Sequence, residues 1–105
     1  MENNSAKTLQ YYTVITSIKS KDPIIELLQQ NGAKGINVTY GHGSAKKGVL
    51  AQAFGFDTEE KKLIVTCLIP TENAVTVTKT LYESFNFNKA NTGIAFGIKV
   101  DALLF

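Results

Sequence analysis

The chain has 105 residues and a mass of 11.4 kDa, the size of a single domain with one modest hydrophobic core. Apolar residues make up 44% of the sequence and the formal net charge is +2, so extensive intrinsic disorder is excluded. No apolar run is long enough for a membrane-spanning helix, no signal peptide is visible, and the single cysteine, Cys67, excludes a disulfide scaffold. We therefore expect a cytoplasmic protein that is not integral to a membrane.

The basic residues are all lysines, and apart from two doublets they are spread along the chain. Arginine supplies the bidentate contacts with phosphate and guanine that nucleic-acid-binding proteins commonly use. The composition therefore shows no basic footprint for nucleic acid, and we expect no such partner.

The first elements of the chain follow from local patterns. Residues 1–9 are polar and lack a period, which predicts a flexible tail. Residues 11–19 are rich in β-branched and aromatic side chains and predict a strand. A helix should then begin with Asp22 as its cap and Pro23 in its first position, and Gly32 should end it in a left-handed conformation.

The middle of the chain predicts two strands separated by a long loop. Residues 36–40 alternate strictly, as a strand with one buried face does, and residues 63–69 form a continuous apolar run that ends at Pro70. Between them, residues 41–60 contain four glycines and several charged side chains. A loop of that length in a compact domain is usually functional or disordered.

The last third of the chain predicts a helix and a strand. Residues 71–85 place apolar side chains at helical spacing, at Ala74, Val77, Leu81 and Phe85, although residues 75–78 also alternate like a strand. We expect a helix because the stripe persists for three turns. Residues 86–93 predict a polar loop, and the alternating residues 94–100 predict the last strand.

The predicted order of elements is β-α-β-β-α-β over a single domain, residues 1–105. This is the α+β, ferredoxin-like sandwich, in which a four-stranded antiparallel sheet carries two helices on one face. The other face stays uncovered. The central strand is apolar on both sides, so we expect apolar residues such as Tyr11 and Ile15 on this open face. An open apolar face usually marks an interaction surface, so we expect self-association.

Several short stretches together resemble the nitrogen-regulatory P-II signalling proteins. They are residues 32–39, Gly41-His42-Gly43 followed by Lys46 and Gly48, the spacing to Lys62, the strand end at Pro70, and residues 91–96. The resemblance covers about residues 11–101, and it rests on the order and spacing of these stretches.

The resemblance implies a homotrimer whose sheets pack around a threefold axis. It implies signal transduction without catalysis, with ATP or ADP as an effector in clefts between subunits, magnesium as an accompanying ion and no tightly bound cofactor. Residues 43–60 correspond to the family's T-loop, which docks onto a target protein such as a transporter or its associated protein.

The resemblance also implies site residues at matching positions. Gly41 and Gly43 match glycines at the base of the T-loop, and Lys62 matches a lysine that faces the ligand cleft. Thr92 and Gly93 match part of a loop that cradles phosphates through backbone N–H groups. The remaining ligand-binding candidates are Leu68 and Ser17 at adenine-lining positions, Lys34 near the base, and His42, Lys46 and Asn91 beside the matched loops.

The sequence departs from the family pattern at positions that bear on nucleotide binding. Ile94 stands where the phosphate loop usually has a lysine, Thr66 replaces a carboxylate, and Ala45 stands near the place of a loop glutamine. Residues 41–60 contain no tyrosine for uridylylation, and the chain has no arginine. Fewer cationic contacts predict weaker binding of a triphosphate, and the missing glutamine argues against sensing of 2-oxoglutarate.

Other readings of the same sequence stay open. The lost cationic residues also fit an interaction module of this fold whose nucleotide site has decayed. A metal-linked trimer of the CutA type shares the architecture, although His42 and Cys67 are far apart in the sequence and no metal-ligand spacing is visible. An enzyme is not expected, because His42 has no visible partner that would orient it as a base.

Overall fold

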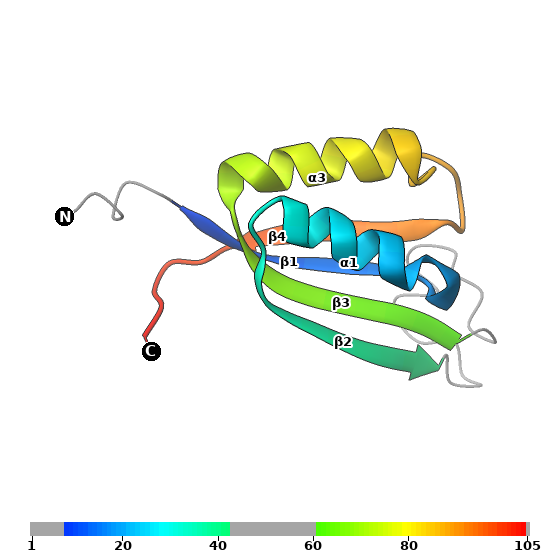
Figure 1. Ribbon diagram of the computed structural model, residues 1–105, viewed down its shortest axis with the longest axis horizontal. Coiled ribbons are helices and arrows are strands. Elements are labelled where there is room, and N and C mark those ends of the chain that lie inside the picture. The colour runs from blue at the N-terminus through cyan, green and yellow to red at the C-terminus, as the bar shows by residue number, and fades with distance from the viewer. Residues whose placement is uncertain (1–7, 43–60, 105) are drawn as a thin grey trace.

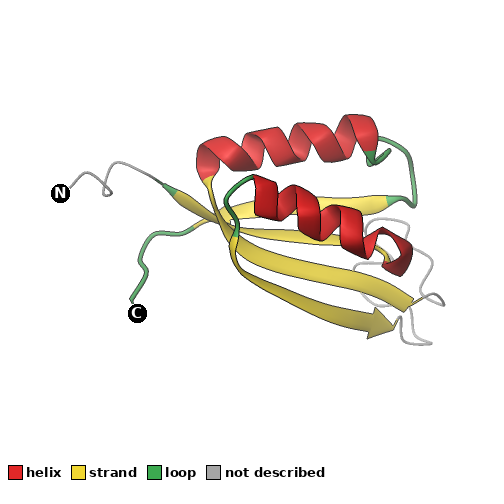
Figure 2. Ribbon diagram, in the orientation of Figure 1, coloured by secondary structure: helices red, strands yellow, loops and turns green. Residues whose placement is uncertain are grey.

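The fold is known from a computed structural model that describes residues 8–42 and 61–104 (Figure 1). The elements in chain order are β1 (Leu9–Ser17), the 3-10 turn η2 (Ile18–Ser20), α1 (Lys21–Gln30), β2 (Lys34–His42), β3 (Lys61–Pro70), α3 (Thr71–Ser84) and β4 (Gly93–Lys99). The strands form one sheet in the order β2-β3-β1-β4, and all neighbours are antiparallel. Figure 2 shows both helices on the same face of this sheet. The predicted ferredoxin-like fold is confirmed, and the predicted loop 43–60 lies outside the described residues.

The limits of β1 differ from the prediction at both ends. The strand begins at Leu9, and the Thr8 hydroxyl donates a hydrogen bond to the Thr71 hydroxyl, so the predicted tail is too long by these two residues. At the other end, Ile18 and Lys19 belong to η2 and not to the strand. The side chain of Ser17 explains this ending, because it accepts a hydrogen bond from the Lys19 backbone N–H and turns the chain.

Helix α1 begins at Lys21, two residues earlier than predicted, and ends where predicted. Ser20 is the N-cap and makes no side-chain capping bond, so the prediction that Asp22 caps the helix was wrong; Asp22 lies within the first turn. There its carboxylate is favourably placed against the positive end of the helix dipole. Gly32 has φ +80°, and the neighbouring Ala33 N–H donates to the Leu28 carbonyl, which confirms the left-handed stop.

Residues 71–84 are helical, as the apolar spacing predicts. Ala74, Val77 and Leu81 are buried against the sheet, and Phe85, partly buried, is the residue that ends the helix. Residues 75–78 alternate like a strand, but they pair with none of the four strands of the sheet. The burial of one apolar stripe of the helix therefore outweighs the low helix propensity of the threonines.

The core lies between the sheet and the two helices. Its side chains come from alternate strand positions and from one stripe of each helix: Tyr12, Val14, Ile24, Leu28, Leu63, Val65, Cys67, Ile69, Ala74, Val77 and Leu81. Tyr12 is the largest of them, and its hydroxyl shares a hydrogen bond with that of Thr78 on α3. Burial raises the pKa of Tyr12, while this hydrogen bond acts in the opposite direction.

Neither helix of residues 8–42 and 61–104 covers the opposite face of the sheet. On β3, Leu63, Val65, Cys67 and Ile69 point into the core, so the residues between them point to this open face. Strands β1 and β4 add Tyr11, Phe96 and Ile98, which are 44%, 42% and 56% exposed. The expected open apolar face is therefore present.

Candidate functional site

The candidate residues fall into two groups at opposite ends of the open face. At the end where β2 stops and β3 starts, Gly41 pairs with Lys62, and Lys62 pairs with Ser17 across three adjacent strands. We call these three residues the loop-end row. At the other end, the cross-strand pairs align Lys34, Leu68, Tyr11 and Ile98, one from each strand, and we call these four residues the tail-end row.

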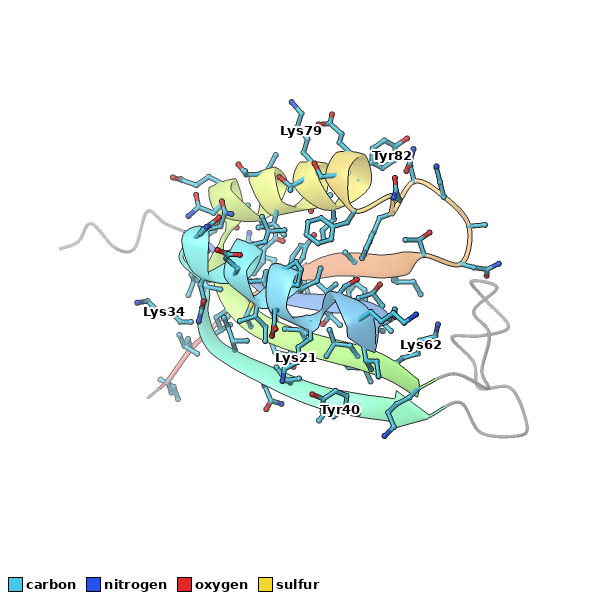
Figure 3. The ribbon with its side chains drawn as sticks, turned by 45° about the vertical axis from the view of Figure 1, so that its right-hand side comes forward. Lys21, Lys34, Tyr40, Lys62, Lys79 and Tyr82 are labelled. Carbon is cyan, nitrogen blue, oxygen red and sulfur yellow. The ribbon has the colours of Figure 1, made fainter. Side chains whose placement is uncertain are left out.

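The two rows are well separated within one chain. Lys62 and Leu68 are six residues apart on β3, which corresponds to about 20 Å along an extended strand. Figure 3 shows Lys62 and Lys34 at opposite ends of the sheet. Ser17 and Leu68 were both predicted to line an adenine pocket, and a single subunit does not bring them together.

The loop-end row combines a cation, a hydroxyl and a position without a side chain. Lys62 is half-buried, and Ser17 already uses its hydroxyl to hold the η2 turn. A Cβ on Gly41 would lie 3.0 Å from the Cδ1 atom of Ile64, the flexible end of its side chain. Gly41 therefore leaves space on the surface beside Lys62. A small side chain at this position would require only a modest shift of the Ile64 side chain.

The loop before β4 lies beside the loop-end row. Thr16, next to Ser17, pairs with Gly93, and its hydroxyl donates a 2.8 Å hydrogen bond to the Thr92 carbonyl. Asn91 has φ +64°, a left-handed conformation that a non-glycine residue seldom adopts. The predicted residues Asn91, Thr92 and Gly93 thus form a sharp, anchored turn close to Ser17.

Gly93 has a packing role that the sequence did not reveal. A Cβ at this position would overlap the ring of Phe87, whose backbone N–H donates to the Leu81 carbonyl at the end of α3. The absence of a side chain at Gly93 therefore lets the loop close onto the sheet. In the sequence, the only sign of this contact is that the aromatic residue Phe87 lies shortly before Gly93.

The tail-end row begins at an irregularity of β2. The register shifts between Lys34 and Asn37, so β2 holds one more residue than β3 there, and Gly35 has φ +60°. This is the geometry of a β-bulge with a left-handed glycine. Because of it, Lys34 lies exposed next to the half-buried Leu68 on the open face.

The remaining candidates lie at or beyond the edge of the described structure. The backbone of His42 ends β2 and pairs with Lys61. Gly43 and Lys46 lie outside the described residues. Within residues 8–42 and 61–104, no three His, Cys, Asp or Glu side chains gather as a metal site would require, and no helix there is long and apolar enough to cross a membrane.

The comparisons with known proteins agree on one family. The profile of the family "Nitrogen regulatory protein P-II" matches residues 10–104. The chain belongs to this family. No curated protein sequence matches it.

Solved structures of P-II-like proteins share the fold of this P-II family member. A PII-like signalling protein of Thermus thermophilus has a TM-score of 0.65 at 22% identity, over 89% of this chain and 87% of that one. CPII of Thiomonas intermedia, bound to ADP, AMP and acetate, has a TM-score of 0.64 at 18% identity, over 90% of both chains. B. subtilis GlnK bound to ATP has a TM-score of 0.58 at 12% identity, over 90% of this chain and 85% of that one.

The single cysteine of this P-II protein has a structural position. Cys67 is 1% exposed within the core, and burial raises the pKa of its thiol to about 11. The thiolate is the nucleophilic form and the form that binds metals, so burial and the raised pKa both argue for a structural role of Cys67.

Proposed function

We propose that this protein is a homotrimeric, non-enzymatic sensor in the cytoplasm. It binds ATP or ADP between subunits and regulates a target protein through residues 43–60. Membership of the P-II family and the nucleotides in two structurally similar P-II-like proteins support this proposal.

The separation of the two rows carries the proposal. Lys62, with the turn of Thr92 and Gly93 beside it, supplies a cation and backbone N–H groups suited to phosphates. Lys34 and Leu68 offer a cation and an apolar surface for a base, but about 20 Å away on the same face. One subunit therefore cannot place both groups on one nucleotide, whereas the loop end of one copy beside the tail end of another can.

The open apolar face supports the assembly part of the proposal. Tyr11, Phe96 and Ile98 would leave water on contact with further copies, and burial of apolar surface drives association. Closed symmetric rings are the usual result for soluble homo-oligomers. Nucleotide binding at such an interface can regulate a target if the nucleotide has different affinities for two states of residues 43–60.

Calorimetric titration with ATP, ADP and AMP, with and without magnesium and 2-oxoglutarate, tests the proposal. We expect micromolar binding of an adenine nucleotide near one per subunit, and a mass of three subunits by light scattering. The Lys62→Ala variant should bind more weakly, whereas Lys79→Ala, a change on the outer helix α3, should not. No binding at millimolar nucleotide would instead indicate an interaction module with a decayed site.

A further inference from the structure

A groove lies between α3 and the edge strand β4, on the face of the sheet that carries the helices. Its volume is about 420 Å³, and Figure 1 shows the two elements that flank it. Binding sites for small molecules commonly have volumes of about 300–1,000 Å³. The proposed nucleotide site and the proposed contacts between copies use the open face, so this groove has no part in either. The residues that line it are Gln10, Tyr12, Ala74, Val75, Thr78, Lys79, Tyr82 and Gly97.

Gly97 and Gln10 form one end of the groove. A Cβ at Gly97 would overlap the Gln10 carboxamide and would lie 3.1 Å from the Cδ1 atom of Tyr12. The glycine therefore provides the space in which this carboxamide lies. Gln10 is half-buried, and its side chain makes no hydrogen bond within residues 8–42 and 61–104. Its amide group is therefore available to a ligand in the groove.

Tyr12 and Thr78 supply a further hydrogen-bond donor to the groove. Tyr12 is 2% exposed, and its hydroxyl shares one hydrogen bond with the Thr78 hydroxyl. Each hydroxyl carries one hydrogen, so whichever group donates in this bond, the other keeps a hydrogen for a second bond. Burial raises the pKa of Tyr12, so the phenol is protonated at neutral pH. This pair therefore suits a ligand that accepts a hydrogen bond.

The other lining residues define the charge and the body of the ligand. Lys79 is the only charged side chain among the described residues that line the groove, so the groove favours an anion. Val75 and Tyr82, two turns apart on α3, are 65% and 58% exposed. An apolar ligand would remove part of both side chains from water. Tyr82 also offers a ring against which an aromatic ligand can pack, and Figure 3 shows Tyr82 and Lys79 projecting from α3.

We infer that this groove binds a small aromatic carboxylate. The carboxylate accepts hydrogen bonds from the Gln10 amide and from the spare hydroxyl hydrogen, and its charge is opposite to that of Lys79. The ring of the ligand lies against Val75 and Tyr82. The inference does not depend on the proposed nucleotide site or on the proposed trimer.

Titration with phenylacetate, followed by the backbone amide signals of the isotope-labelled full chain, tests this inference. We expect saturable shifts at Gly97 and Thr78, with a Kd in the millimolar range. Benzyl alcohol has the same ring but no carboxylate, and it should bind about tenfold more weakly. Equal affinities for the two compounds would overturn the role of the carboxylate. A lack of saturable binding at these two positions would overturn the site.

Two substitutions test the residues that we assign to the carboxylate. Gln10→Leu removes the carboxamide and keeps a side chain of similar size, and it should raise the Kd for phenylacetate by about tenfold. Gln30→Leu makes the same change at an exposed position of α1 and should leave the Kd unchanged. Lys79→Met, on the exposed side of α3, should raise the Kd by about two- to fivefold, the range for an exposed ion pair. Wild-type affinity in both Gln10→Leu and Lys79→Met would contradict the assignment.

Competition with ADP distinguishes the groove from the proposed nucleotide site. An excess of ADP should leave the Kd for phenylacetate unchanged, because the two sites lie on opposite faces of the sheet. Displacement of phenylacetate by ADP, or shifts confined to the neighbours of Lys62, would place the probe in the nucleotide site and overturn the inference. If ADP itself does not bind, the proposed function fails, and the titration with phenylacetate still decides this inference.

Discussion

The two ends of the open sheet face differ in chemistry although the same strands build both. The loop-end row consists of a glycine, a lysine and a serine, and it lies against a turn held by hydrogen bonds. The tail-end row consists of a lysine followed by three large apolar side chains. We propose that one face serves two purposes, with polar groups for the phosphates at the loop end and apolar area for both association and the base at the tail end.

The largest effect is expected from a charge in the tail-end row. Tyr11→Asp places a carboxylate in the apolar surface that we propose other copies cover, and burying an unpaired charge costs several kcal/mol. The variant should be monomeric by light scattering while it keeps its circular dichroism spectrum. Ser17→Asp, the same change at the loop end of the same strand, should stay assembled. Equal masses for the two variants would show that the tail end does not contribute more to association than the loop end.

A methyl group at Gly93 should destabilise the loop-end turn. Gly93→Ala forces the Phe87 ring to move, and overpacking of this kind costs about 1–3 kcal/mol. Urea unfolding measures the loss, and the double variant with Phe87→Leu should recover part of it. Gly41→Ala is the control at the same end of the sheet, because it meets only the flexible end of Ile64 and should cost less.

Loss of the loop-end cation should weaken the ligand without changing the assembly. A hydrogen bond to a charged group contributes about 1.5–3 kcal/mol, so Lys62→Ala should raise the Kd for ADP by about tenfold or more. Calorimetry measures the affinity and light scattering the mass. An unchanged Kd would show that Lys62 does not contact the phosphates. A changed mass would show that Lys62 also supports the assembly.

The smallest effect concerns the anchor of the turn. Thr16→Val keeps the shape of the side chain but leaves the Thr92 carbonyl without its hydrogen bond, at a cost of about 1 kcal/mol. If the turn binds phosphates, the Kd for ADP should rise by a few fold while the mass by light scattering stays unchanged. Thr39→Val is the comparison, because its 3.3 Å bond to the Ile64 carbonyl lies away from this turn. Equal affinities for ADP in both variants would show that the hydrogen bond from Thr16 to the turn does not contribute to nucleotide binding.

Local patterns predicted the elements well, because each depends on neighbours in the sequence. The stripe of Ala74, Val77 and Leu81 predicts α3, and Gly32 predicts the end of α1. The end of β1 was missed, because Ile18 and Lys19 suit a strand, whereas the capping bond to Ser17 and the bond from the Lys21 N–H to the Ile18 carbonyl turn the chain. Here the hydrogen bonds of one short turn outweigh the strand propensity of two residues.

The arrangement of the candidate site could not be predicted in the same way. The resemblance named Ser17, Leu68 and Lys62 as neighbours of one ligand, but their separation depends on the register between β1 and β3. Register is set by contacts between residues about fifty positions apart in the sequence, which no local pattern reports. The packing of Phe87 against Gly93 is hidden for the same reason, since it depends on how the loop closes onto the sheet.

The bulge at Gly35 has a consequence for growth of the sheet. Strand β2 is an edge strand, and a straight edge offers its free backbone groups to any other strand, the route by which sheets grow into fibres. The extra residue between Lys34 and Asn37 bends this edge, and the exposed lysine adds a charge to it. The bent and charged edge therefore disfavours the addition of further strands, so that any association is directed to the face of the sheet and away from its edge.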